Sequence, residues 1–126
     1  MATKEQKKIR KQWVAALRSG QYKQGIGALV TLGDKYDRFC CLGVLCDMAV
    51  RAGVIESPIV IGLEENLAYG LDLATGALPQ EVVDWVGINT CAGDFEGSDL
   101  AWLNDKGKKF KTIAKIIESE PEGLFV

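Results

Sequence analysis

The longest run of apolar positions in the chain lies at residues 39–52, which read FCCLGVLCDMAVRA. Wound as a helix, this segment is apolar on nearly every side, and such helices are usually buried in a core. Its exceptions are spaced four apart, so that Gly43, Asp47 and Arg51 form one stripe. The spacing favours an ion pair between Asp47 and Arg51, and the glycine allows a close approach to the helix backbone. We therefore expect a buried central helix with one polar seam.

Apolar positions that recur every three or four residues predict further helices. One covers residues 4–19 and has a strongly basic outer face, and another covers residues 110–119. A shorter helix is predicted between Pro79, near its start, and Gly87, just past its end. A helical turn is expected at residues 100–103, after a loop.

The remaining apolar segments have the lengths and residue types of strands. Residues 26–32 and 36–40 flank a Gly-Asp-Lys turn and predict a hairpin, and residues 59–63 form a short apolar run. Residues 67–73 alternate strictly between apolar and small or polar side chains, which indicates a strand with one buried face. The expected fold is α+β: one small domain over residues 1–126, with a buried central helix, three or four other helices and a small antiparallel sheet.

Composition and charge narrow the class of protein. The chain of 126 residues is of single-domain size and has the apolar and charged content of an ordinary globular protein. Its net charge of −2 is unevenly placed, at +6 for residues 1–38, −10 for residues 39–105 and +2 for residues 106–126. Two basic ends and an acidic middle suit either an anion held between the ends or self-association. An N-terminus without an apolar segment and the lack of a 20-residue apolar run favour a cytoplasmic protein with no membrane partner.

The four cysteines offer little chemistry at this spacing. Cys40 and Cys41 are adjacent, Cys46 follows five positions later, and Cys91 is the only distant thiol. Zinc sites favour pairs two to four residues apart, often with histidine, and the chain has no histidine. Without histidine the usual base for a cysteine or serine nucleophile is also missing. We expect buried structural thiols, no metal or cofactor, and no enzymatic activity.

Two polar clusters are candidates for ligand binding. RSGQYKQGIG, at residues 18–27, combines charged, aromatic and amide side chains with exposed glycine backbone, although an ordinary helix-to-strand connection explains it equally well. NDKGKK, at residues 104–109, adds lysines and another amide, although an Asn-Asp pair before glycine commonly only caps a turn. If these clusters bind a ligand that has phosphates and a flat ring, their cations would contact the phosphates, the phenol would stack on the ring, and the amides would bond to the polar edges of the ring. The candidate ligand-binding residues are Arg18, Tyr22, Lys23, Gln24, Asn104 and Lys106. No recognition helix follows residues 110–119, which disfavours sequence-specific nucleic-acid binding.

Four blocks of the sequence resemble a set of small bacteriophage and prophage proteins. The blocks are WVAALRSGQYKQGIGAL, RFCCLGVLCD, LPQEVVDWVGI and LAWLNDKGKKFKTIAKIIE, which together span most of the chain. The shared pattern is Trp-x-x-Ala-Leu-Arg-Ser-Gly, Tyr-x-Gln-Gly, Phe-Cys-Cys-Leu-Gly-Val-Leu-Cys-Asp and a final Leu-Asn-Asp-x-Gly helix. The resemblance implies a phage origin and hence a place in the host cytoplasm.

A phage origin changes the expected function. Small phage proteins without catalytic residues are often inhibitors of host systems, and one class sequesters cyclic-nucleotide immune signals between identical subunits. The leading hypothesis is a homo-oligomeric phage protein that binds and sequesters such a phosphate-bearing signal without chemistry. The alternative is a phage inhibitor or adaptor that acts by binding a host protein.

Overall fold

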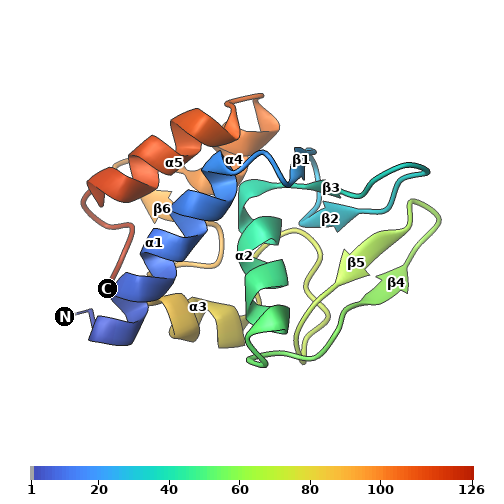
Figure 1. The fold of residues 1–126 in the computed structure, drawn as a ribbon, viewed down its shortest axis with the longest axis horizontal. Coiled ribbons are helices and arrows are strands. Elements are labelled where there is room, and N and C mark those ends of the chain that lie inside the picture. The colour runs from blue at the N-terminus through green and yellow to red at the C-terminus, as the bar shows by residue number, and fades with distance from the viewer. Residues whose placement is uncertain (1) are drawn as a thin grey trace.

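The computed structural model describes residues 2–126, which form an α+β domain with the helices at one end and a small sheet at the other (Figure 1). The helices are α1 (Lys4–Arg18), α2 (Cys41–Arg51), α3 (Gln80–Val86), α4 (Leu100–Asp105) and α5 (Phe110–Ser119). The strands are β1 (Lys23–Gln24), β2 (Val30–Thr31), β3 (Arg38–Phe39), β4 (Ile59–Ile61), β5 (Asn66–Ala68), β6 (Asp94–Phe95) and β7 (Ser98–Asp99). The predicted fold class is confirmed.

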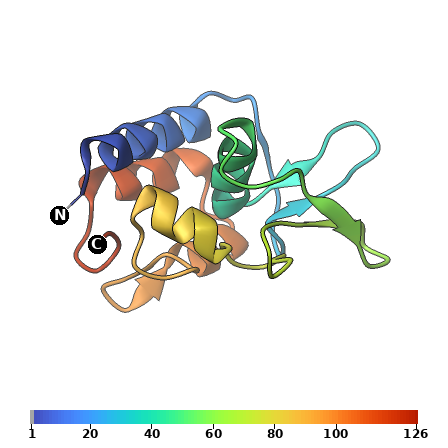
Figure 2. The same ribbon diagram turned by 90° about the horizontal axis from the view of Figure 1, so that it is seen from below.

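Helix α2 lies at the centre of the molecule, between the other helices and the sheet (Figures 1 and 2). Its first six residues, Cys41–Cys46, are all buried, and only its last turn reaches the surface. The Trp13 indole of α1 donates a hydrogen bond to the Cys41 carbonyl at 3.0 Å, which fixes α1 against the start of α2. The prediction of a buried central helix is confirmed.

Gly43 lies where the backbone of Leu29, just before β2, passes against α2. A Cβ at this position would overlap the carbonyl oxygen of Leu29, which is also the acceptor for the Cys40 N–H at 2.9 Å. A side chain here would therefore push apart two elements that a backbone hydrogen bond holds together. The predicted close approach at this glycine is confirmed.

The helical end is built on the packing of α1 along α5, with α3 against the start of α1 (Figure 2). The apolar stripes predicted for both long helices are buried, as Trp13 and Ile113 illustrate with no exposed surface. Helix α3 ends at Gly87 in the left-handed conformation, as predicted, while Pro79 is its N-cap rather than its first helical residue. No helix in residues 2–126 is long and apolar enough to cross a membrane.

The main sheet has the strand order β1-β3-β2-β5-β4, and β6 and β7 form a separate pair. All neighbours are antiparallel except β1 and β3, which are parallel, so the sheet is mixed rather than wholly antiparallel. The predicted hairpin exists as β2 and β3, with shorter strands than expected. Strand β4 lies at the edge, and all three of its side chains are exposed.

The strand predicted over residues 67–73 is wrong beyond Ala68. Tyr69 pairs with Ala74 across a tight turn, and Leu71 is 94% exposed. Gly70 and Leu73 both have positive φ, which bends the chain away from the sheet. The alternation of residues 67–73 continues through this turn, so the second half of the pattern does not mark the buried face of a strand.

Candidate functional site

The six candidate ligand-binding residues do not converge on a single site. Gln24 and Asn104 bond to each other inside the domain, and Tyr22 bonds to α2. Lys23 and Lys106 each lie over a surface aromatic ring, while Arg18 lines a groove between α1 and α5. Each arrangement offers different chemistry.

The amides of Gln24 and Asn104 are internal connectors. Asn104 is fully buried; its Oδ1 accepts hydrogen bonds from the Cys41 N–H at 3.1 Å and from Gln24 Nε2 at 2.9 Å, and its Nδ2 donates to the Gly25 carbonyl at 2.8 Å. Gln24 also donates to a carbonyl of the loop after α4 at 2.7 Å and accepts from the Phe110 N–H at 3.1 Å. These amides join the starts of α2 and α5 through bonds within the domain, which is a different role from the ligand contact predicted for them.

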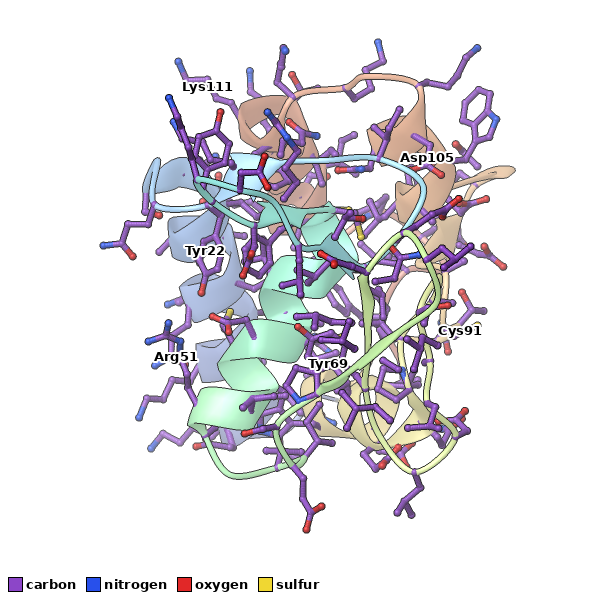
Figure 3. The ribbon with its side chains drawn as sticks, turned by 90° about the vertical axis from the view of Figure 1, so that its right-hand side faces the viewer. Tyr22, Arg51, Tyr69, Cys91, Asp105 and Lys111 are labelled. Atoms are coloured by element: carbon purple, nitrogen blue, oxygen red, sulfur yellow. The ribbon has the colours of Figure 1, made fainter. Side chains whose placement is uncertain are left out.

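Tyr22 forms a polar cluster with the seam of α2. Its hydroxyl donates a hydrogen bond to Asp47 Oδ2 at 2.6 Å, and the same oxygen accepts from Arg51 Nε at 2.9 Å. Figure 3 shows Tyr22 and Arg51 on the same flank of the molecule. Burial, followed by the bond to Asp47, raises the pKa of Tyr22 to about 12. The predicted Asp47–Arg51 ion pair is confirmed, and the ring of Tyr22 packs edge-on against Phe39 at a centroid distance of 4.8 Å rather than standing free to stack.

The two candidate lysines lie over aromatic rings on the surface. Lys23 Nζ is 5.6 Å from the ring centroid of Tyr36, and Lys106 Nζ is 4.4 Å from that of Trp102. Such cation–π contacts at exposed sites contribute about 0.5–1 kcal/mol each. Both lysines remain exposed, so their charge is open to a partner.

A groove between α1 and α5 encloses a volume of about 660 Å³. That volume is within the range typical of small-molecule sites. Its apolar lining residues are the exposed Ala15 and, beneath it, the buried Val14 and Ile117. Its charged residues are Lys7, Arg10, Lys11, Arg18, Glu118 and Glu120. Four cations against two carboxylates give it an excess of positive charge.

Arg10, one of the four cations, is held by contacts within the fold. Arg10 is 6% exposed and donates hydrogen bonds to the carbonyls of Val86 at 3.0 Å and Gly87 at 3.1 Å. It also pairs with Glu120 at 3.2 Å and stacks over the ring of Phe125 at 3.9 Å. Burial lowers the pKa of Arg10, and the carboxylate of Glu120 opposes that shift. Arg10 therefore joins α1 to the end of α3 and to the C-terminal segment.

The other three cations are available at the rim. Arg18 makes two hydrogen bonds of 3.0 Å to the two carboxylate oxygens of Glu118, and both side chains are largely in solvent. Exposed pairs of this kind contribute little, about 0–1 kcal/mol, so Arg18 can exchange its partner at low cost. Lys7 and Lys11 lie one turn apart on α1, are exposed, and have no ion-pair partner within residues 2–126.

The cysteines behave largely as predicted. Cys40, Cys41 and Cys46 are buried, and burial raises the pKa of the Cys40 thiol to about 11 and those of the other two well above their usual value. Cys91 is exposed, so the prediction of a buried thiol is wrong there. Across the described residues, no three Cys, Asp or Glu side chains gather as a metal site would require.

The groove residues Lys7 and Lys11 were not among the predicted site residues. Their signal was present in the basic face of residues 4–19, but the sequence does not show that residues 110–119 pack beside that face. Trp102 was also overlooked as a surface aromatic, although it is 51% exposed next to Lys106.

Comparison with known proteins gives a family but no activity. No curated protein and no solved structure matches the chain. One family model, described as a domain of unknown function (DUF8296), matches residues 5–121 and so covers every helix and strand from α1 to α5 except the first residue of α1. The chain belongs to this DUF8296 family.

Proposed function

We propose that this protein binds and sequesters a phosphate-bearing ligand of the cyclic-nucleotide type, without chemical change, in the groove between α1 and α5. The observation that carries the proposal is the combination of an apolar wall with cations that are not needed elsewhere. A nucleotide has the matching parts, because its base is flat and weakly polar and its phosphates are anionic.

The contacts follow from the rim and wall of the groove. Lys7 and Lys11 would meet one phosphate group, since their side chains extend from successive turns of the same helix face. Arg18 would leave Glu118 for a phosphate, to which a guanidinium binds in the same bidentate manner. The base would lie on Ala15, above the buried Val14 and Ile117, and the released Glu118 carboxylate would accept from its exocyclic amine.

Of the predicted site residues, Arg18 is retained in this proposal. Gln24 and Asn104 are bonded internally, and Tyr22, Lys23 and Lys106 do not line the groove. The target, the location and the assembly proposed here are those that the sequence indicated. The resemblance to phage proteins supports action against a host immune signal in the host cytoplasm, by an assembly of more than one copy.

Isothermal titration against a panel of cyclic di- and trinucleotides tests the proposal. We expect one member to bind the parent protein, and the double variant Lys7→Glu/Lys11→Glu to lose at least about tenfold in affinity, since each lost contact to a phosphate weakens binding by about 1–2 kcal/mol. Lys4→Glu/Lys8→Glu is the matched control, because it makes the same charge change on α1 away from the groove. No heat with any member, or equal losses in both double variants, would refute it.

A second candidate function is inhibition or recruitment of a host protein. The edge strand β4 favours it, because its three apolar side chains are exposed and its outer backbone groups are open to pairing with another strand. Purification from host lysate with the parent protein and with Val60→Glu distinguishes the candidates. A stoichiometric host protein retained by the parent alone, together with no nucleotide binding, would favour this function.

A further inference from the structure

We propose that the tip of the β4–β5 hairpin of one copy docks into the α1–α5 groove of a second copy, so that the protein assembles head to tail. The hairpin tip here means residues 62–65, Gly-Leu-Glu-Glu. The inference concerns assembly and does not rest on nucleotide binding, because it requires only the two surfaces of the chain itself. The tip would occupy the same groove as the proposed ligand, so a docked tip and a bound nucleotide exclude each other there.

The hairpin tip presents one apolar side chain between acidic neighbours. Leu63 is fully exposed at 104% of its reference surface, and Glu64 and Glu65 follow it directly. The Glu65 N–H bonds to the Gly62 carbonyl at 3.2 Å, and the Glu65 carbonyl accepts from the Leu32 N–H at 3.0 Å. The tip is thus held in one shape against β2, which lowers the entropy cost of docking it.

The groove has the complementary chemistry. Leu63 matches the apolar surface at Ala15, above the buried Val14 and Ile117, and the two glutamates match the unpaired Lys7 and Lys11 at the rim. The charges of the two surfaces are complementary, because residues 52–105 contain no lysine or arginine while the groove carries an excess of cations. Docking would also bury the fully exposed Leu63.

The positions of the two surfaces require a second copy. Figures 1 and 2 show α1 and α5 at one end of the molecule and the β4–β5 hairpin projecting from the other. The tip therefore cannot reach the groove of its own chain. A contact between two different surfaces is heterologous, and it repeats until a ring closes or a filament grows.

Light scattering coupled to size exclusion, with no nucleotide present, measures the assembly. We expect the average mass of the parent protein to rise with concentration, and Leu63→Ser/Glu64→Lys to weaken self-association at least about tenfold, as truncation of a central contact does. The control Leu71→Ser/Asp72→Lys changes an equally exposed leucine and acid outside the tip and should assemble like the parent. Circular dichroism and melting curves verify that each variant is folded.

A charge exchange makes the test specific to the two surfaces. Glu64→Lys alone and Lys11→Glu alone should both assemble poorly, and mixing them should restore assembly, because each tip then finds a groove of opposite charge. A parent protein that is monomeric at every concentration, or assembly that the tip variants leave unchanged, would overturn the inference. Nucleotide titration of Leu63→Ser/Glu64→Lys, whose groove is intact, tests the ligand proposal separately.

Discussion

Gly43 allows the sheet and the central helix to share a backbone contact. The Leu29 carbonyl lies against this glycine and at the same time accepts the Cys40 N–H, so neither element can shift without loss of the other contact. A residue without a side chain is thus a packing requirement at this position.

Gly43→Ala should destabilise the domain by about 2–3 kcal/mol, the upper part of the range for overpacking a tight core, because its methyl group would meet the Leu29 carbonyl. Gly76→Ala is the control, since a Cβ there meets nothing within 4 Å and φ is not positive. Urea unfolding of both variants measures the difference. Equal midpoints for the two would contradict the assigned contact.

The Tyr22 hydroxyl makes stability depend on alkaline pH. Its pKa in the folded state, about 12, exceeds the ordinary value of 10.0, so the contribution is complete below pH 10 and is lost as pH rises toward 12. Tyr22→Phe should therefore be less stable than the parent by about 1 kcal/mol at pH 8, the usual value of one hydrogen bond, and the gap should shrink as the pH rises above 10.

Urea titrations of the parent and of Tyr22→Phe at several pH values test this. The difference between the two proteins isolates the phenol, because the buried thiols titrate in both. A difference in unfolding free energy that stays constant with pH would show that the bond from Tyr22 to Asp47 does not govern the loss of stability at high pH.

At the element scale, the buried Asn104 side chain joins three segments that are far apart in the sequence. It satisfies the Cys41 N–H at the start of α2 and the Gly25 carbonyl after β1, and through Gln24 it reaches the start of α5. The orphan donors at the starts of two helices are thus paired by one amide network.

Asn104→Ala should cost about 3 kcal/mol or more, because it leaves a buried N–H and a buried carbonyl without partners. Asn66→Ala is the comparison: this half-buried amide accepts one bond from the Thr31 hydroxyl at 2.9 Å, and its loss should cost about 1 kcal/mol. Thermal melts rank the two variants. Similar melting temperatures would mean that water replaces Asn104 easily.

The elements show where sequence patterns suffice and where they do not. The helices at residues 4–19 and 110–119 follow from periodicity, since one stripe of each is buried against the other. The strand at residues 67–73 fails after Ala68 because a turn with positive φ at Gly70 and Leu73 carries the same alternation as a strand. The roles of Gln24 and Asn104 were missed because a buried amide and an exposed one look alike in a sequence.

At the scale of the whole molecule, a basic surface and an acidic hairpin tip lie at opposite ends. Helix α1, with its basic residues, packs on α5, and the β4–β5 hairpin that carries Glu64 and Glu65 projects from the other end (Figure 1). The charge pattern of the sequence suited either two basic ends held together around an anion or self-association, and the packing of α1 on α5 places the two ends side by side. It did not predict the groove itself, because Arg18 and Glu118 are a hundred positions apart along the chain.

The same global packing divides the thiols into two classes. The buried thiols of Cys40, Cys41 and Cys46 lie around the central helix, whereas Cys91 is on the surface, on a different side of the molecule from Tyr22 and Arg51 (Figure 3). A thiol reacts as the thiolate, and burial both hides the sulfur and raises its pKa. Reaction at the three buried sites therefore requires the core to open.

Titration with a disulfide reagent should accordingly count one fast thiol in the native protein and four in denaturant. The three buried thiols should react at least about a thousandfold more slowly than the fast one, because a small domain needs several kcal/mol to unfold. Cys91→Ser should remove the fast phase and leave the slow one unchanged. If the native protein had a second fast thiol, we would assign it to Cys40, the N-cap of α2. That result would mean that the start of α2 opens without global unfolding.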